Sequence, residues 1–465
     1  MGLSRSDYLQ GLVFFAPTLL ACVAAAVAVT WRRFGGLGAA PAATAIGLLA
    51  SAAVFAAHLL PLALGVMTRG TVLLAAVLLL ALALALARER TGAGPPPASP
   101  PASDRWSWAV AGAALGLVAV WGCAYLVSRS GQPVIALDAL NSHFPQSARW
   151  IQSGTAWQLD QFNVDFQGST YPDNGNLMQL VVILPWRSLF AVRYAGVPFL
   201  LLTAVAVYAI GLELRAPRAT AALAAAAIVA LPAVAGPALQ LGQVDPPMYA
   251  WLAAGVLFLL RFARHGRTPE LVLAGIGLGL AFGTKWYAVA DVPLIVAIWA
   301  AASLAAGRAP RAVARQVLLV GGVVVLAGGF WLLRNWVEAG DPFHPVVVRA
   351  FGVTIFDSPP DPFRKLAGFS IAHYATDFGV WRHYLLPALL RQLGWAAAAV
   401  ALAALAGGAW AAARLRRRAS PDAARVAVLA LAAIGMAVVY TLLPFTAFGL
   451  EGRPLLAQAN VRYVV

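Results

Sequence analysis

The chain has few charged residues and almost no cysteine. Only 11% of its 465 residues are charged, whereas 61% are hydrophobic. A water-soluble domain needs far more polar surface than this, so the composition excludes an ordinary soluble protein. Both cysteines, Cys22 and Cys123, lie inside apolar runs, which excludes a disulfide framework and a cysteine-based metal site.

Long apolar runs make up most of the remaining sequence. A run of about 20 apolar residues can cross the hydrocarbon core as a helix. The sequence contains about twelve such runs, and it therefore predicts an all-α integral membrane protein. The predicted spans are 10–31, 41–66, 70–88, 107–128, 191–213, 219–236, 247–263, 269–283, 286–305, 317–335, 385–412 and 425–447.

The formal net charge of +15 comes from arginines that cluster between the apolar runs. This pattern fixes membrane orientation and does not indicate a nucleic-acid partner. With the N-terminus outside, the arginine clusters between the spans fall on the cytoplasmic side, and twelve of the eighteen acidic residues fall outside. The arginine-rich, lysine-poor usage is compatible with a GC-rich bacterial genome, so we expect a multi-pass protein of the bacterial cytoplasmic membrane.

A stretch rich in proline, alanine and serine divides the chain. Residues 91–105 read TGAGPPPASPPASDR, a composition that favours an extended tether over packed structure. We expect a three-helix membrane segment at 1–90, a cytoplasmic linker at 91–105 and a membrane module at 106–465. Two predicted outer loops, about 129–190 and 336–384, are long, and loops of that length are usually functional.

The first long outer loop begins with a candidate catalytic carboxylate, Asp138, in the stretch ALDALNSHFPQSARWIQSG at 136–154. Apolar residues at spacings of three and four predict an amphipathic helix on the membrane surface, with short interfacial helices in both loops. Asp138 faces away from the lipid on such a helix, on the side of Arg149. His143 points elsewhere, so the spacing does not support a tight Asp–His dyad.

Three further outer segments carry charged residues next to predicted spans. Asp245 lies in QLGQVDPPMYAW at 240–251, and Lys285 lies in GLAFGTKWYAVAD at 278–291. The segment RNWVEAGDPFHP at 334–345 contains Arg334, Asp341 and His344.

From about residue 105 onward, these features resemble the polytopic glycosyltransferases of the GT-C superfamily. The resemblance is to the bacterial branch related to protein O-mannosyltransferases and lipid A aminoarabinose transferases. It lies in the aspartate that opens the first long outer loop, the helix ending in WIQSG, the GTKW hairpin, the RNWVEAGDPFHP segment and VRYVV at 461–465. Each motif is short, and their shared order and sidedness give the resemblance its specificity. The chain ends at Val465, where this pattern expects a further helix, so we expect a module truncated at its C-terminus or without the family's terminal domain.

The resemblance implies an enzyme that passes a sugar from a polyprenyl-phosphate donor to a glycan, lipid or protein acceptor at the outer face, usually with inversion. Asp138 matches the position of the family's catalytic aspartate, although Ala139 follows where many members have a glutamate. Such transfer needs a carboxylate to accept the acceptor's proton and cations on the departing phosphate. Lys285, Arg334 and Arg462 are the candidate cations.

Simpler explanations exist for each candidate. Asp138 could stabilise a helix N-terminus, Asp245 could cap the next helix or bind a divalent metal, and Lys285 and Arg334 could extend to the membrane interface. Arg149, Asp341 and His344 are further candidates for substrate binding. No cofactor is certain from the sequence.

Two other functions remain open at this point. A ligase or polymerase of lipid-linked glycans would share the donor type and the outer site. A transporter or lipid flippase usually places ionisable residues near the bilayer midplane, whereas here nearly all charges lie at the ends of spans.

Overall fold

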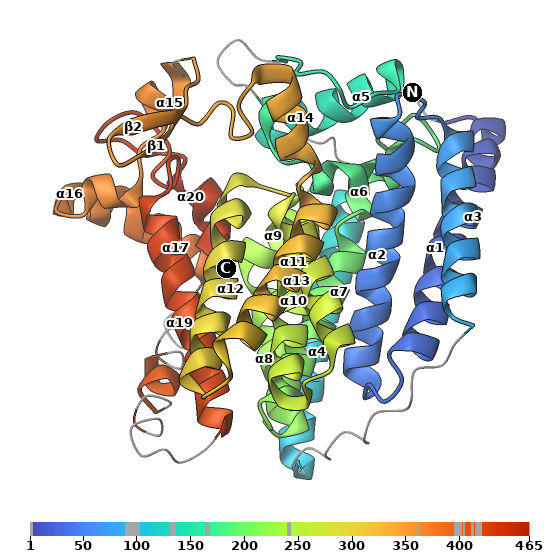
Figure 1. Cartoon of the computed structure of the whole chain (residues 1–465). Coiled ribbons are helices and arrows are strands. Elements are labelled where there is room, and N and C mark those ends of the chain that lie inside the picture. Colours follow the sequence, from blue (N-terminus) through green and yellow to red (C-terminus); the bar gives the residue numbers. More distant parts are fainter. Residues whose placement is uncertain are drawn as a thin grey trace.

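The computed structural model describes residues 3–88, 103–130, 136–162, 168–239, 243–359, 362–394, 402, 405–410, 413 and 421–464. Helices dominate these residues, which confirms the predicted all-α membrane fold (Figure 1). The described part contains one small sheet, the antiparallel hairpin of β1 (Val348–Ala350) and β2 (Val353–Phe356). Most of the predicted 91–105 linker lies outside the described residues.

The first three helices are α1 (Arg5–Arg33), α2 (Ala39–Ala63) and α3 (Arg69–Leu86), and they pack side by side. They share one apolar core with the central helices, because α2 also packs against α7 (Val197–Glu213). Trp251 donates a hydrogen bond to the Ser51 hydroxyl at 2.9 Å, which joins α10 (Asp245–His265) to α2. The N-terminal segment is therefore packed onto the rest of the bundle.

The central bundle continues with α4 (Arg105–Arg129), α8 (Arg218–Ala230), α9 (Pro232–Leu239), α11 (Thr268–Phe282), α12 (Trp286–Ala305) and α13 (Pro310–Gly328). Helices α10 and α11 approach closely where Gly277 lies against Gly255. A Cβ atom on Gly277 would come within 2.7 Å of both the Gly255 nitrogen and the Trp251 oxygen. Glycine at this contact allows the two backbones to meet.

Nine helices in the described residues are long and apolar enough to cross a membrane. A tenth is possible if α8 and α9 form one span, which is bent by 62°. The predicted count of about twelve is not confirmed: α11 has 15 residues, and only α17 (Leu386–Leu393) is described at the start of the predicted span 385–412. The final long helix is α19 (Pro421–Leu442).

The arginine-bearing connections meet at one end of the bundle. Arg267 donates to the Gly35 oxygen at 3.0 Å, and Arg308 donates to the Ala263 oxygen at 3.1 Å. Arg33 likewise donates to the Leu86 oxygen at 2.6 Å. These bonds join the α1–α2, α10–α11 and α12–α13 connections to the ends of α3 and α10.

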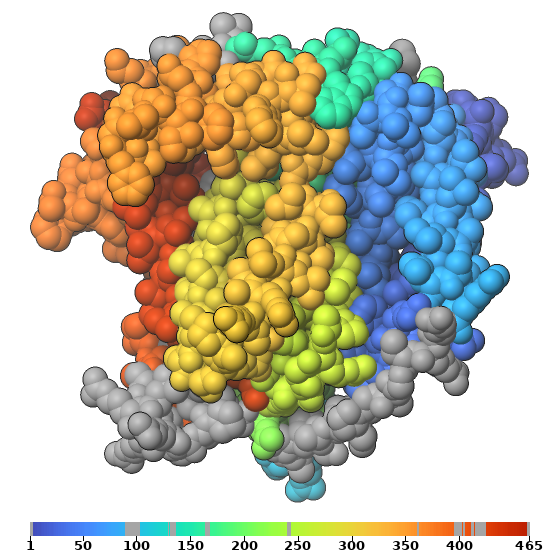
Figure 2. Space-filling view, in the orientation of Figure 1, coloured from blue at the N-terminus to red at the C-terminus, as the bar shows by residue number. Residues whose placement is uncertain are grey.

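Several elements of the two long loops, among them α5 and α14, form a cap at the other end, where the N-terminus also lies (Figure 1). The first loop contains η1 (Ala139–His143), α5 (Phe144–Ser153), η2 (Gly168–Thr170) and α6 (Asn174–Ile183), and η3 (Val192–Tyr194) begins the next candidate span. The second contains α14 (Phe330–Ala339), the hairpin, α15 (Pro362–Ala367), η4 (Ile371–Tyr374), α16 (Phe378–Val380) and η5 (Trp381–Leu385). Figure 2 shows this second loop overhanging a recess between α12 and α17.

Candidate active site

Four charged residues named from the sequence meet beneath the cap. Asp138 immediately precedes η1, Asp245 begins α10, and Lys285 is the N-cap of α12. Arg462 lies on η6 (Val461–Val464), which follows the short helix α20 (Ala457–Asn460). More than 300 residues separate Asp138 from Arg462 along the chain, since their hydrogen bond spans 324 positions.

Arg462 and Lys285 join the two carboxylates into one ionic cluster. The Arg462 guanidinium donates a hydrogen bond to Asp138 Oδ2, and its Nε lies 3.5 Å from Asp245 Oδ1. Lys285 Nζ donates to the same Asp245 oxygen at 3.0 Å, and the Tyr287 hydroxyl lies 3.2 Å from it. Asp245 therefore holds both cations in place, and Asp138 meets one of them.

The members of this cluster differ in their access to solvent. The Asp245 side chain is 0% exposed, and those of Lys285 and Arg462 are 9% and 6% exposed. The Asp138 side chain is 42% exposed. The cluster thus contains one solvent-accessible carboxylate, Asp138, and two buried cations, Lys285 and Arg462.

The cations also determine the ionisation of Asp138. Burial alone would raise the pKa of Asp138, but the charges of Arg462 and Lys285 outweigh it and hold the pKa below the ordinary aspartate value. Burial and the charge of Lys285 lower the pKa of His143 to about 4. At neutral pH the site therefore contains an ionised Asp138 and a neutral His143.

His143 lies within the electrostatic influence of this cluster without bonding to Asp138. No hydrogen bond between the two residues is present, and the charges of Asp138, Asp245 and Arg462 all act on the imidazole. Between them η1 forms a π-helical turn, in which the angular spacing differs from that of an α-helix. An Asp–His dyad, which the sequence spacing does not support, is not formed by these two side chains.

The sequence around each cation fixes its position. Pro246 and Pro247 occupy the first turn of α10, where proline is tolerated, so the helix begins at Asp245. Gly283 precedes Lys285 and packs so tightly that an added Cβ would lie 2.4 Å from Asn174 Nδ2. Tyr249 donates a hydrogen bond to the Arg462 carbonyl oxygen at 2.9 Å, which holds η6 against α10.

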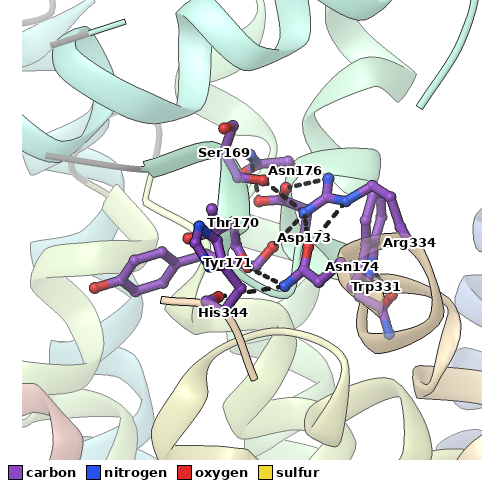
Figure 3. A network of polar contacts seen from close by, with 10 residues as sticks. Ser169, Thr170, Tyr171, Asp173, Asn174, Asn176, Trp331, Arg334 and His344 are labelled. Atoms are coloured by element: carbon purple, nitrogen blue, oxygen red, sulfur yellow. Dashed lines mark hydrogen bonds and ion pairs between the residues drawn. The ribbon is translucent and has the colours of Figure 1, made fainter. Parts of the chain in front are cut away.

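The structure places Arg334 in a second polar network, away from solvent (Figure 3). Its side chain is 0% exposed and donates to the Ser169 oxygen at 2.5 Å and to the Tyr171 oxygen at 3.3 Å. Asp173 Oδ2 lies 3.6 Å from Arg334 Nη1, and burial raises the pKa of Asp173 to about 7. These contacts occupy Arg334 with the first outer loop, so we do not include it among the phosphate-binding candidates.

Asn174 is the centre of this network and was not singled out from the sequence. Its side chain accepts a hydrogen bond from Trp331 at 2.7 Å and donates to the Leu280 and Ala327 oxygens at 3.0 and 3.2 Å. It thereby joins α6 to α11, α13 and α14. The stretch FQGSTYPDNGNL, which contains it, reads as an ordinary polar turn, and only the tertiary contacts distinguish this asparagine.

The remaining candidates form separate contacts. Asp341 accepts hydrogen bonds from the Phe343 nitrogen at 2.8 Å and the Ser358 hydroxyl at 2.7 Å, and His344 Nδ1 lies 3.3 Å from that hydroxyl. Arg149 pairs with Asp160 at 3.0 Å. The structure thus unites Asp138, Asp245, Lys285 and Arg462, and it leaves Arg149, Arg334, Asp341 and His344 outside that cluster.

The described residues contain no group of three or more histidine, cysteine, aspartate or glutamate side chains that could hold a metal ion. Asp245, the metal candidate from the sequence, is surrounded by Lys285, Arg462 and the Tyr287 hydroxyl. Two cationic neighbours repel a divalent cation, so this donor set does not fit one.

Part of the chain matches the model of a known protein family. Residues 176–331 match the model of the dolichyl-phosphate-mannose-protein mannosyltransferase family. This family is of the GT-C type, which confirms the predicted resemblance. The match includes Asp245 and Lys285, whereas Asp138 and Arg462 lie outside it. It points to a membrane glycosyltransferase with a lipid-linked donor. No match was found among the curated proteins or the solved structures.

Proposed function

We propose that the protein transfers a sugar from a polyprenyl-phosphate donor to an acceptor at the extracytoplasmic face of the bacterial cytoplasmic membrane. The observation that carries this proposal is the convergence of a half-exposed carboxylate, Asp138, with two buried cations, Lys285 and Arg462. The acceptor is a glycan, a lipid or a protein that presents a hydroxyl group.

The arrangement fits an inverting displacement with Asp138 as the general base. The acceptor oxygen attacks the anomeric carbon, and the bond from that carbon to the phosphate oxygen breaks with its electron pair on the phosphate. The acceptor proton passes to the Asp138 carboxylate. Negative charge that develops on the departing phosphate is stabilised by Lys285 and Arg462, which are desolvated and already in position.

Asp245 has a positioning role in this mechanism. It is fully buried, so it contacts neither acceptor nor solvent, and its carboxylate holds Lys285 and Arg462. Without Asp245, two cations would lie close together without a buried counter-charge, at a high electrostatic cost.

Two features support the membrane geometry of the proposal. The arginine-bearing connections gather at the end of the bundle opposite the cap, and such connections are typically cytoplasmic. The recess between α12 and α17 opens on the side of the bundle, where a lipid-linked donor would approach (Figure 2). Lys285, the N-cap residue of α12, belongs to the charged cluster beneath the cap.

One observation favours a lipid transporter as the second candidate. Helices α8 and α9 form a bent pair, with an angle of 62° between them, and broken helices line the substrate sites of many transporters. A transporter moves its lipid unchanged, whereas the proposed enzyme cleaves the bond from sugar to phosphate.

Release of free polyprenyl phosphate separates these two functions. The purified protein in lipid nanodiscs is given a panel of polyprenyl-phosphate sugars together with hydroxyl acceptors from cell-envelope extracts. We expect release of polyprenyl phosphate together with a glycosylated product of inverted anomeric configuration. Flipping of the intact donor in proteoliposomes without any cleavage would overturn the transferase proposal and support the transporter.

A further inference from the structure

The segment from α15 to α17 departs from the charge pattern of the outer side. Residues 362–394 contain four basic residues and one acidic residue, Asp377, although most acidic residues of the chain fall on the predicted outer side. Outer segments that adjoin spans usually carry few lysines and arginines. The basic residues Arg364, Lys365, Arg382 and Arg391 therefore call for a specific explanation.

Large apolar side chains are exposed beside these basic residues. Phe378 is 84% exposed, and Leu366 is 60% exposed. Leu386 and Leu390 are also exposed on α17, where the predicted span 385–412 begins. We define the α16 patch as the exposed residues Phe378, Arg382, Leu386 and Leu390, which follow one another at spacings of four along α16, η5 and α17.

The patch lies on a firmly packed scaffold. Ile371, Tyr374, Val380 and Leu385 form a buried cluster with Tyr440 of α19 and with residues of α20 and η6. Asp377 caps α16 by accepting a hydrogen bond from the Val380 nitrogen at 3.0 Å. Buried residues precede and follow Phe378 in the sequence, so the folded structure itself holds its side chain at the surface.

The position of α16 indicates what covers the patch. Figure 1 shows α16 projecting sideways from the bundle beside α17, below the level of α5 and α14. Phe378 is an exposed residue of this projecting helix, which places it where we expect the headgroup layer of the bilayer around the bundle. Aromatic and aliphatic side chains enter that layer, and neighbouring lysines and arginines bind lipid phosphates.

We propose that the α16 patch docks onto the anionic headgroup layer of the outer leaflet of the cytoplasmic membrane. Phe378, Leu386 and Leu390 enter the boundary between headgroups and acyl chains, while Arg382 contacts lipid phosphates. The same scaffold carries η6 and hence Arg462, so docking ties the candidate active site to the membrane surface. This inference concerns the bulk lipid and is independent of the sugar chemistry.

Depth measurements on single-cysteine variants test the proposal. Phe378→Cys and the control Gln152→Cys, an exposed position on α5 in the cap, are prepared in a Cys123→Ser background, because Cys123 is exposed and Cys22 is buried. Each carries an environment-sensitive fluorophore in nanodiscs. We expect lipids spin-labelled near the headgroup to quench the label at position 378 severalfold more than the label at 152, and aqueous iodide to show the reverse. Equal quenching of both labels by iodide would overturn the proposal.

The contribution of charge is tested in discs with and without phosphatidylglycerol. Adding this lipid to phosphatidylcholine discs should increase lipid quenching at position 378, and Arg382→Gln should abolish the increase. The matched control, Arg187→Gln, removes one exposed arginine outside the patch and should retain it. The role of anionic lipid would be contradicted if phosphatidylglycerol did not increase the quenching in the unaltered patch. It would also be contradicted if the increase persisted after the patch had lost its positive charge.

Discussion

Arg462 connects the two carboxylates of the candidate site, and its charge controls the state of the accessible one. Its guanidinium donates a hydrogen bond to Asp138 and also forms an ion pair with the buried Asp245. A general base must be ionised before it can accept a proton. The low pKa of Asp138 therefore keeps the proposed base ready at neutral pH, at the cost of weaker proton affinity.

The pH dependence of the reaction follows from this ion pair. Because the pKa of Asp138 is depressed, the carboxylate stays ionised as the pH falls from 7, and the acid-side loss of kcat/KM should begin only below the ordinary aspartate range of about 4. Arg462→Gln removes the opposing charge, so the pKa of Asp138 rises and the acid limb moves to higher pH. Arg462→Lys keeps the charge and serves as the control. A pH–rate profile with the same acid limb in native and Gln variants would contradict this assignment.

At the scale of elements, Arg334 and Asn174 fasten the first outer loop to the helices below it. Arg334 binds backbone oxygens of the loop, and Asn174 bonds to α11, α13 and α14. The Trp331 ring stacks on Trp150 of α5, with 5.4 Å between ring centroids. Since Asp138 lies on this loop, these contacts of Arg334, Asn174 and Trp331 help to fix the position of the proposed base.

Replacement of Arg334 should act on stability rather than on donor affinity. Arg334→Gln removes the charged donor to the Ser169 and Tyr171 oxygens and the cation beside Asp173, and a hydrogen bond from a charged group typically contributes about 1.5–3 kcal/mol. We expect a clearly lower thermal unfolding temperature and an unchanged KM for the donor in the folded fraction. Combining Arg334→Gln with Asp173→Asn should recover part of the stability. A raised KM without a change in unfolding temperature would show instead that Arg334 binds the phosphate.

A second buried network joins helices at the opposite end. Arg261 donates to Glu270 at 3.2 Å and also bonds to Glu213, which links α10 to α11 and α7. Arg261→Gln leaves the buried Glu270 without its cation, whereas Glu213 keeps Arg264 at 3.4 Å, and the expected loss is about 3–5 kcal/mol. Thermal unfolding should report this loss, while kcat below the transition stays at the native value. A selective fall in kcat would show that this end participates in turnover.

The sequence predicted helices more reliably than it predicted contacts. The run 10–31 became α1 and the run 286–305 became α12, because long apolar runs are read directly from composition. Asp138, Asp245, Lys285 and Arg462 were named as candidates from their predicted places at the outer membrane boundary and from the resemblance to the GT-C superfamily. The burial of Arg334, the role of Asn174 and the position of His143 depend on tertiary packing and on a π-helical turn, which periodicity does not encode.

At the scale of the whole molecule, the charge distribution gives the bundle two different ends. One end gathers the arginine-bearing connections, and the other carries the cap, the N-terminus and the candidate site. The predicted orientation has the cap outside the cell, and it fixes the side of the membrane on which every loop lies. One position at each end of the bundle is therefore enough to test it.

Cysteine labelling tests this orientation. In a Cys123→Ser background, Gln152→Cys lies in the cap and Ala306→Cys lies exposed in the α12–α13 connection. A membrane-impermeant maleimide should label Gln152→Cys in intact spheroplasts and Ala306→Cys only in inverted vesicles. The opposite pattern would place the candidate site in the cytoplasm and exclude the proposed extracytoplasmic reaction.

The most direct measurement is the release of free polyprenyl phosphate by Asp138→Asn, compared with native protein, in nanodiscs with the donor and acceptor that the native protein uses. The amide cannot accept the proton, so the rate should fall by about 10²–10⁴-fold. Loss of the pair with Arg462 lowers stability somewhat, so the rates are compared below the unfolding transition, where both proteins are folded. The matched control is Asp160→Asn, which makes the same change on the same outer loop outside the charged cluster and should keep the native rate. Native turnover by a folded Asp138→Asn protein would contradict the assignment of Asp138 as the base.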